Sequence, residues 1–416
     1  MRSRISLFAL CTLSISALAI GQETSPGISI PVTISGEVRQ SQETNQAASF
    51  TPGFRAVLSP SLRFGSRWFA YAALDVHSSS YFPYELGAED DRTVGVELMQ
   101  AFIGYVRSSS RSSILIKAGQ ISSAFGLSPM DYDDFKMPLI NPPLAYTAKL
   151  PIRADQVPCG VEDIIWQTYD SGVAYHCGGS AAESYGLTPV TLYGLPSVEV
   201  QVSLSHFDGR LQITNSSPAN PHGLFSGSQR AQWTAGGGYT FAHAFHIGAS
   251  GFRGPYLDSN LIPSLPRNTR LASFPASGFG IDANWSRDAW SARGEWLHLR
   301  FNTPRFIESP SQSAAYFELK RIVSPRIYAA GRLNFEDFGP IEDQSGLTAT
   351  HSAGPEELYE LAIGFRLNRQ QLLKVGAGWQ HGNAWSSTGA YWPKTESHTF
   401  ELQLVTSFTA VSKAFQ

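Results

Sequence analysis

Segments of strand length in which apolar and polar side chains alternate constrain this chain more than any other feature of its sequence. In the segment 400–408, one face carries Phe400, Leu402, Leu404, Thr406 and Phe408, and the other carries Glu401, Gln403 and Ser407. Because side chains along a strand point alternately to its two faces, such a segment has one apolar and one polar side. Such a segment fits a strand of a soluble sheet, with one face toward the core and the other toward solvent. It also fits a strand of a membrane-spanning barrel, with one face toward lipid and the other toward the lumen.

These segments occur in pairs that are joined by short turns. The predicted turns lie at residues 66–67, 108–111, 208–209, 242–243, 287–288, 324–325 and 368–369. The arms contain about ten residues, which is the length that a tilted strand needs to cross a bilayer. Seven hairpins, with Val32–Gln40 at the start and Phe400–Phe408 at the end, predict sixteen strands. A pair of shorter arms within residues 163–176 would raise this to eighteen, but we interpret it as an appendage of a loop.

Long connections rich in Pro, Gly and Ser join each hairpin to the next, and the longest lies around residues 122–196. Transmembrane barrels sort their connections in this way, with short periplasmic turns and long extracellular loops. A hydrophobic content of 42% agrees with this fold, because only every second residue of a barrel strand faces lipid. The sequence therefore predicts an all-β, transmembrane, antiparallel up-and-down β-barrel of about sixteen strands.

Residues 1–21 have the features of a secretory signal peptide: Arg2 and Arg4, an apolar run over 5–20, and small residues at the cleavage region. We expect residues 22–416 to form a single barrel. No second apolar run is long enough for a spanning helix. Without the leader, 29 Lys and Arg face 34 Asp and Glu, and this acidity argues against nucleic-acid binding. Cys159 and Cys177 are predicted to form a disulfide in the periplasm, with two buried thiols as the alternative.

The chain resembles the porin-type outer-membrane β-barrels of Gram-negative bacteria. Three features carry the resemblance: the terminal strand ending in Phe408, the segment 118–120 followed by Phe125 and Gly126, and the leader. It implies an outer-membrane location, contact with outer-membrane lipid, and assembly by the barrel-assembly machinery, with Phe400 and Phe408 as the assembly signal. A homotrimer is an open alternative for the assembly. In many such barrels the closing aromatic residue ends the chain, whereas here residues 409–416 follow it, and Phe415 is a second candidate.

If the lumen is a pore, charged side chains on the inward faces set its selectivity. The candidate pore-lining residues are Arg293, Glu295, Glu318, Lys320, Arg326, Arg332, Glu336, Glu360, Arg366 and Lys374, and a wider set adds Arg55, Arg63, Asp75 and Asp282. The alternative is that these charges pair with one another and only hydrate the wall. The candidate constriction loop carries Asp131, Asp133, Asp134 and Lys136. Folded inward, its carboxylates would narrow the pore and favour cations; folded outward, they would be a solvated cluster.

No enzyme motif is recognisable in the sequence: it has no Gly-x-Ser-x-Gly elbow, no His-Glu-x-x-His helix and no phosphate-binding loop. We therefore predict a channel for passive diffusion of small hydrophilic solutes, with no enzymatic activity, cofactor or metal. The alternatives are a barrel-embedded hydrolase and a structural or adhesive barrel that is plugged by the long loop. Trp233, Trp285, Trp290, Trp296 and Trp379 are interpreted as anchors at the lipid headgroups.

Overall fold

The structure is a computed structural model. It describes residues 27–43, 49–78, 81, 94–127, 133–147, 150, 152–169, 175, 177, 194–215, 231–241, 244–387, 390–392 and 394–414. The predicted leader, residues 1–21, lies outside the described residues, as do Asp131 and Phe415. Among the described residues, no helix combines the length and the apolar character that crossing a membrane requires.

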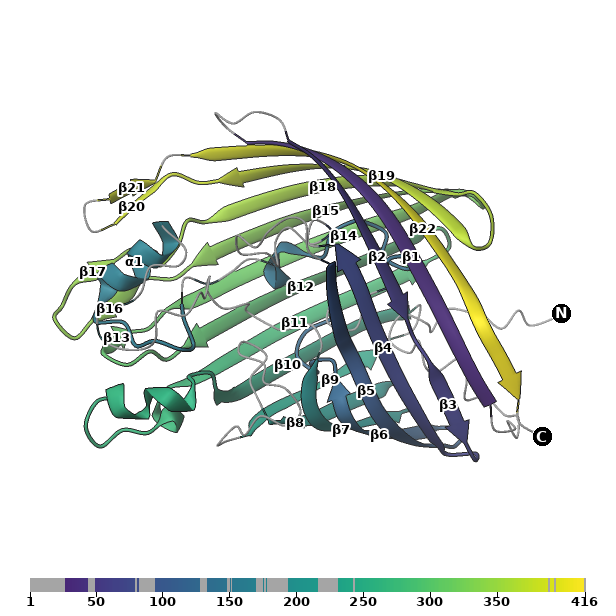
Figure 1. Ribbon diagram of the computed structural model, residues 1–416, viewed down its shortest axis with the longest axis horizontal. Helices are drawn as coiled ribbons and strands as arrows, with labels where there is room; N and C mark the ends of the chain where they lie inside the picture. Colours follow the sequence, from purple (N-terminus) through teal and green to yellow (C-terminus); the bar gives the residue numbers. More distant parts are fainter. Residues whose placement is uncertain are drawn as a thin grey trace.

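The described strands close into an antiparallel barrel with sixteen strand positions (Figure 1). The strands are β1 (Gly27–Glu43), β2 (Ser49–Leu58), β3 (Ser61–Phe64), β4 (Trp68–Ser78), β5 (Val94–Ser108), β6 (Ser112–Ile121), β7 (Leu195–Leu204), β8 (Phe207–Thr214), β9 (Gln232–Thr240), β10 (Phe245–Pro255), β11 (Pro275–Arg287), β12 (Trp290–Phe301), β14 (Ser311–Ser324), β15 (Ile327–Phe338), β18 (Glu356–Arg366), β19 (Gln371–Gly382) and β22 (Thr395–Ala414). Segments β2 and β3 share one position, since both pair with β1. Pairing of β1 with β22 closes the cylinder.

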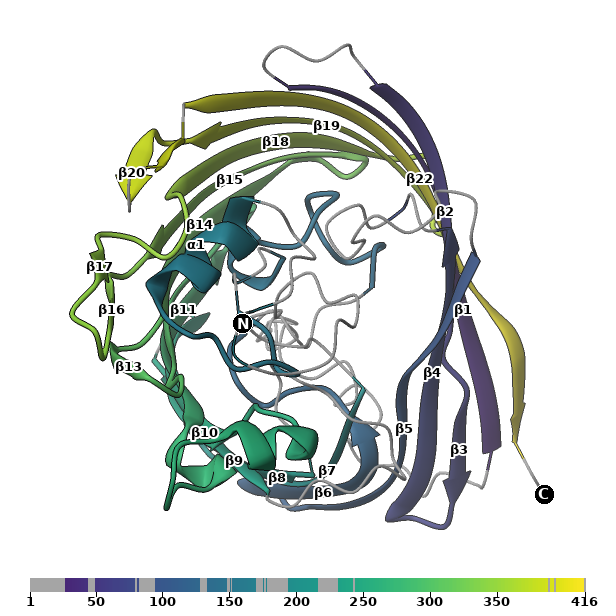
Figure 2. The same ribbon diagram turned by 60° about the vertical axis from the view of Figure 1, so that its left-hand side comes forward.

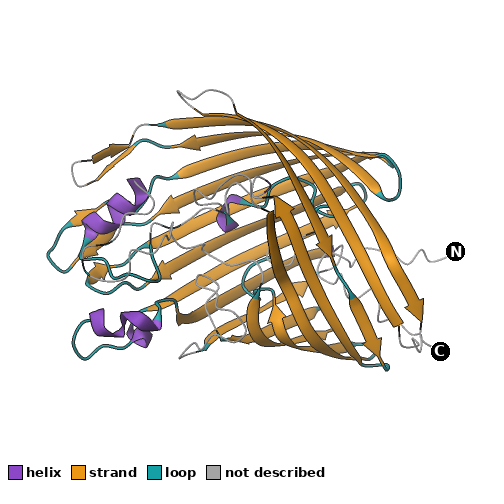
Figure 3. Ribbon diagram, viewed as in Figure 1, coloured by secondary structure: helices purple, strands orange, loops and turns teal. Residues whose placement is uncertain are grey.

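Short turns and long connections lie at opposite ends of the barrel, as predicted. The two ends of the described chain, at the start of β1 and the end of β22, lie at the end with the short turns (Figure 1). The opposite end carries the short elements β13 (Phe306–Glu308), β16 (Ile341–Asp343), β17 (Thr348–Ala349), β20 (Trp385–Ser387), β21 (Ala390–Trp392) and α1 (Val161–Tyr169). Figure 3 shows how little helix accompanies the strands. The described part of the chain also includes the 3-10 turns η4 (Leu144–Tyr146), η6 (Ser259–Ser264) and η7 (Leu271–Ser273).

The two faces of the wall differ as the alternation predicts. Outward positions carry exposed large apolar side chains on strand after strand, for example Phe54, Ile281, Phe317 and Leu404. Inward positions of the same strands carry charged and amide side chains that are buried. An apolar belt outside a closed barrel has no soluble counterpart, because it would leave all of that surface in water. The barrel is therefore a transmembrane one.

The eighteen-strand alternative and one predicted turn are wrong. Residues 163–169, the first arm of the shorter hairpin in that alternative, belong to the helix α1, and residues 170–174 and 176 lie outside the described residues. The turn between β7 and β8 lies at Ser205 and His206, where Ser205 has a φ of 56°, and not at Asp208 and Gly209. The observed and predicted registers differ by an even number of residues, so both leave the residues of 198–204 and 211–214 on the same faces. Alternation therefore cannot distinguish these two turns.

Candidate functional site

The inner wall of the barrel is the candidate functional site. Eight of the ten predicted pore-lining residues lie on inward positions of neighbouring strands: Arg293 and Glu295 on β12, Glu318 and Lys320 on β14, Arg332 and Glu336 on β15, Glu360 on β18, and Lys374 on β19. The other two lie apart from this group. Arg326 is exposed in the turn between β14 and β15, and Arg366 is the exposed last residue of β18.

Ion pairs join four of these residues across β12, β14, β15 and β18. The Arg332 guanidinium, which is 2% exposed, donates from Nε to Glu360 Oε2 at 2.7 Å and lies 3.5 Å from Glu318 Oε2. Arg293 donates to both oxygens of Glu318, at 2.7 and 3.2 Å. The alternative in which the wall charges pair with one another therefore describes this part of the wall.

A second buried group of charges lies on β1, β2, β4 and β22. The Arg55 guanidinium donates to Asp75 at 2.7 Å and to Asp134 of the long loop at 2.9 Å. Arg39 likewise joins Glu401 at 2.7 Å and Glu37 at 2.8 Å. The candidate list missed Glu37 and Arg39. In the sequence both could have been recognised as inward residues, because they alternate with the apolar residues at positions 34, 36 and 38.

The segment 133–147 of the long connection lies inside the barrel, in contact with this wall (Figure 2). Many of the hydrogen bonds that hold this segment run from side chains of the wall to its backbone carbonyls. Lys374 donates to the carbonyl of Leu139 at 3.2 Å, and Arg332 donates to the carbonyls of Asn141 and Pro142 at 2.7 and 2.9 Å. We call this segment the inner loop.

Side chains of the inner loop complete the attachment. The Asn141 amide donates to Glu401 at 3.0 Å, and its oxygen accepts from Arg39 at 3.0 Å. The Tyr146 hydroxyl donates to Glu295 at 2.7 Å. The inner loop is thus bonded to wall strands from β2, through β1, β22, β19 and β15, to β12.

Of the predicted constriction residues, Asp134 is buried and Asp133 and Lys136 are not. Asp134 accepts hydrogen bonds from Arg55, from Ser35 at 2.7 Å and from the hydroxyl of Tyr81 at 2.8 Å. Burial raises the pKa of Tyr81 well above its ordinary value, and the nearby Asp134 carboxylate raises it further, so this phenol stays a donor. Asp133 pairs with Lys136 at 3.3 Å.

One part of the lumen is apolar, which the sequence analysis did not predict. Apolar residues of the long connection pack against inward residues of β10, β11, β12, β14 and β15, among them Phe252, Leu297 and Tyr316. The residues from the connection are Phe125, Ala145, Tyr146, Leu150, Ile152, Ala154 and Val157. Similarly, Ala362 packs with Leu139 and Tyr328. The expectation of a polar, water-filled lumen is therefore wrong for this part of the barrel, which encloses a small hydrophobic core.

At the end with the long connections, α1 and the predicted disulfide form a compact unit. Cys159 and Cys177 are bonded, as predicted. Apolar residues of α1, such as Ile164, pack against Ile341 and Ala349. The carboxylate of Asp343 accepts from the backbone N–H of Val161 at 3.0 Å, which ties the helix to the loop between β15 and β18.

Removing this disulfide is expected to loosen the unit and leave the barrel intact. Closing a loop of this length contributes about 3 kcal/mol in the chain-entropy description, and no strand pairing of the barrel depends on it. In a variant with Cys159→Ser and Cys177→Ser, proteolysis should cleave near α1 sooner, while the unheated protein keeps the gel mobility of a folded barrel. Loss of that folded band would contradict the prediction.

The proposed assembly residues lie on the outward face of β22. Phe400 and Phe408 are both exposed there. The strand does not end at Phe408, because β22 continues to Ala414, paired with the start of β1 past an irregularity between Ile30 and Pro31. The residues from 409 to 414 therefore belong to the wall, and the second candidate, Phe415, lies outside the described residues. The role of the two phenylalanines in assembly stays a prediction.

No family model matches the sequence, and no curated protein is similar to it in sequence. Solved structures with the same fold are the outer membrane channel DcaP of Acinetobacter baumannii (9% identity, 93% of this chain and 99% of that one, TM-score 0.54) and OmpT of Vibrio cholerae (9%, 93% and 99%, 0.51). OprB of Pseudomonas putida is a third (10%, 92% and 94%, 0.50). A closed sixteen-strand barrel, an apolar outer belt and these likenesses together show that the chain has the fold of the porin-type outer-membrane β-barrels.

Proposed function

We propose that this protein is an outer-membrane channel through which small hydrophilic solutes diffuse passively. The observation that carries the proposal is the fastening of the inner loop along the polar wall, from Arg55 on β2 to Glu295 on β12. A segment that is held against the wall narrows the lumen without having to fill it. The predicted pore-lining and constriction residues would then set the width and the charge of the passage.

We propose that width matters more than charge in this channel. Within the described chain, the carboxylates expected to favour cations have cationic partners: Asp134 pairs with Arg55, which also pairs with Asp75, and Asp133 pairs with Lys136. On the wall, Glu318 and Glu360 face Arg293 and Arg332. Paired charges attract passing ions less than single ones do, so cations and anions should permeate at similar rates.

The plugged barrel is the second candidate, and the apolar cluster inside the barrel is the observation that favours it. A barrel filled by its own loop would serve as a structural or adhesive protein. For the hydrolase alternative the described residues offer no comparable observation, and the proposal includes no enzymatic step and no cofactor. Outer-membrane lipid, the barrel-assembly machinery and, as an assembly, a homotrimer complete the proposed partners.

Swelling of liposomes that contain the purified protein tests the proposal. If solutes diffuse through the lumen, liposomes should swell in isotonic solutions of small neutral sugars and amino acids, and more slowly as the solute becomes larger. Protein-free liposomes, and liposomes with heat-denatured protein, are the controls. Liposomes that contain the folded protein and do not swell with even the smallest solute would reject the channel and favour the plugged barrel.

A further inference from the structure

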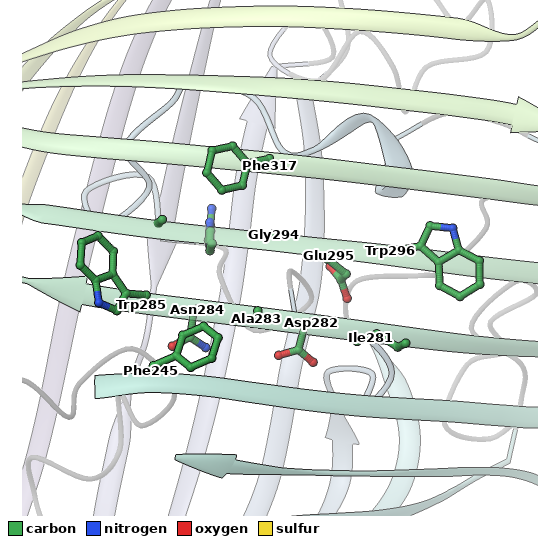
Figure 4. A pocket seen from close by; sticks show the side chains of 12 residues that line it. Phe245, Ile281, Asp282, Ala283, Asn284, Trp285, Gly294, Glu295, Trp296 and Phe317 are labelled. Carbon is green, nitrogen blue, oxygen red and sulfur yellow. The ribbon is translucent and has the colours of Figure 1, made fainter. Parts of the chain in front are cut away.

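The lipid-facing side of the wall has a hollow between β10, β11, β12 and β14 (Figure 4). The hollow has a volume of about 440 Å³. Its floor consists of the small outward residues Ala283, Ala292 and Gly294, and register pairs Ala283 with Gly294. Aromatic and branched side chains surround it, namely Phe245, Ile281, Trp285, Trp296 and Phe317. We call it the outer groove.

The pairing register explains why a groove forms here. Along the row that crosses the four strands, Ile247, Ala283, Gly294 and Phe317 are neighbours, so two small residues lie between two large ones. In the adjoining rows, Trp285 stands beside Ala292, and Ile281 beside Trp296. The large side chains therefore stand around a depression with apolar walls.

A positively charged row borders the groove on the periplasmic side. One register step beyond Trp285 and Ala292 come Arg287, Trp290 and Arg321, next to the short turn at Asp288. The Arg321 guanidinium lies over the Trp290 ring, 4.9 Å from its centre. Arg287 is largely exposed and lies 3.7 Å from the more exposed Asp288, a separation at which a surface pair contributes little.

We propose that the outer groove binds one acyl chain of an anionic glycerophospholipid of the periplasmic leaflet, with the lipid phosphate against Arg287 and Arg321. The charge at the bordering row selects this occupant, since guanidinium groups at headgroup depth attract anionic lipids. Tryptophans at this depth belong in the headgroup region, where Trp290 would lie beside the glycerol. The proposal concerns the outer face of the barrel and stands independently of what passes through the lumen.

Two variants separate the acyl-chain contact from the headgroup contact. Ala283→Leu with Ala292→Leu fills the groove with apolar side chains, which lipid-facing positions tolerate because no protein core opposes them. Arg287→Gln with Arg321→Gln removes both charges and leaves the groove open. Ala377→Leu, at an outward position on β19 far from the groove, is the matched control. Gel mobility of the unheated proteins checks that each variant is folded.

The measurement is native mass spectrometry of detergent-solubilised protein titrated with phosphatidylglycerol or phosphatidylcholine. We expect the unmodified protein and the Ala377→Leu control to retain one phosphatidylglycerol tightly. Filling the groove should weaken this binding at least about tenfold, a change of about 1.4 kcal/mol. Removing the arginines should weaken the binding of phosphatidylglycerol about fivefold per guanidinium, as expected for basic residues beside an anionic lipid. The binding of phosphatidylcholine should weaken less, because its choline cation offsets the charge of its phosphate.

Two results would overturn the proposal. If the groove-filled variant binds phosphatidylglycerol as tightly as the control does, the lipid is held elsewhere. The other result is that the unmodified protein forms an oligomer, that the groove-filled variant does not, and that both bind lipid equally. The occupant of the groove would then be a second copy of the chain. Neither result depends on conductance or on solute permeation.

Discussion

Replacing Arg332 by methionine is expected to lower the free energy of unfolding by about 3–5 kcal/mol, the cost of breaking a buried ion pair by removing one partner. Arg332 is the centre of its network, since it joins Glu360 and Glu318 on the wall and holds two carbonyls of the inner loop. Without it, the buried Glu360 keeps a hydrogen bond from the Asn334 amide at 3.0 Å and loses its neighbouring cation. Urea unfolding of the barrel in lipid vesicles measures the change.

Two further variants identify the cause of that loss. Arg293→Met should lower the free energy of unfolding much less, because Arg293 is partly exposed and its partner Glu318 still has an ion pair with Arg332. Combining Arg332→Met with Glu360→Leu should restore part of the stability, since the carboxylate that lost its cation is then removed as well. A double variant as unstable as Arg332→Met would show that the loop attachment, and not the lone carboxylate, carries the effect.

The second large effect is expected at Leu361, which is 57% exposed near the middle of the outward face of β18. Leu361→Arg should lower the free energy of unfolding by about 2–4 kcal/mol, because it would place a cation in hydrocarbon near the bilayer midplane. Leu367 is similarly exposed, at 51%, but lies in the turn after β18. At that depth the same substitution should cost about 0–1 kcal/mol.

The pair Leu361 and Leu367 distinguishes a barrel in lipid from one in water. In water both exposed leucines would accept arginine with little effect. Unfolding of the two variants in vesicles, with Leu361→Ala as the control for the lost leucine, gives the comparison. Equal stability of the two arginine variants would contradict the position assigned to the apolar belt.

The sequence was sufficient to predict which residues face outward, because that depends only on a period of two. The pattern of β18 and β19, in which Leu361 and Val375 alternate with Glu360 and Lys374, predicts two faces without any knowledge of pairing. Strand number followed from the turns and arm lengths. The turn between β7 and β8 was misplaced at Asp208, because local turn propensity favours Asp-Gly and both registers keep the same faces.

The contents of the lumen could not be predicted, because they depend on contacts between residues that are far apart in sequence. Asp134 was identified as a loop carboxylate, but its ion pair with Arg55, 79 residues away, could be seen only in the fold. Leu297 and Leu299 are apolar residues at inward positions of β12, where polar residues were expected. In the structure they pack against the long connection. Such breaks in the inward polar pattern indicate where a loop packs inside a barrel.

Single-channel recording in a planar lipid bilayer tests the central claim most directly, which is that the inner loop lies along the wall and leaves a water-filled passage. The unmodified protein should produce discrete current steps of constant size in potassium chloride, with little preference between the two ions. Arg332→Met, which releases two carbonyls of the inner loop, should make these currents noisier. Folded protein that is inserted in the bilayer and carries no current would contradict the claim, because it would mean that the connection fills the lumen.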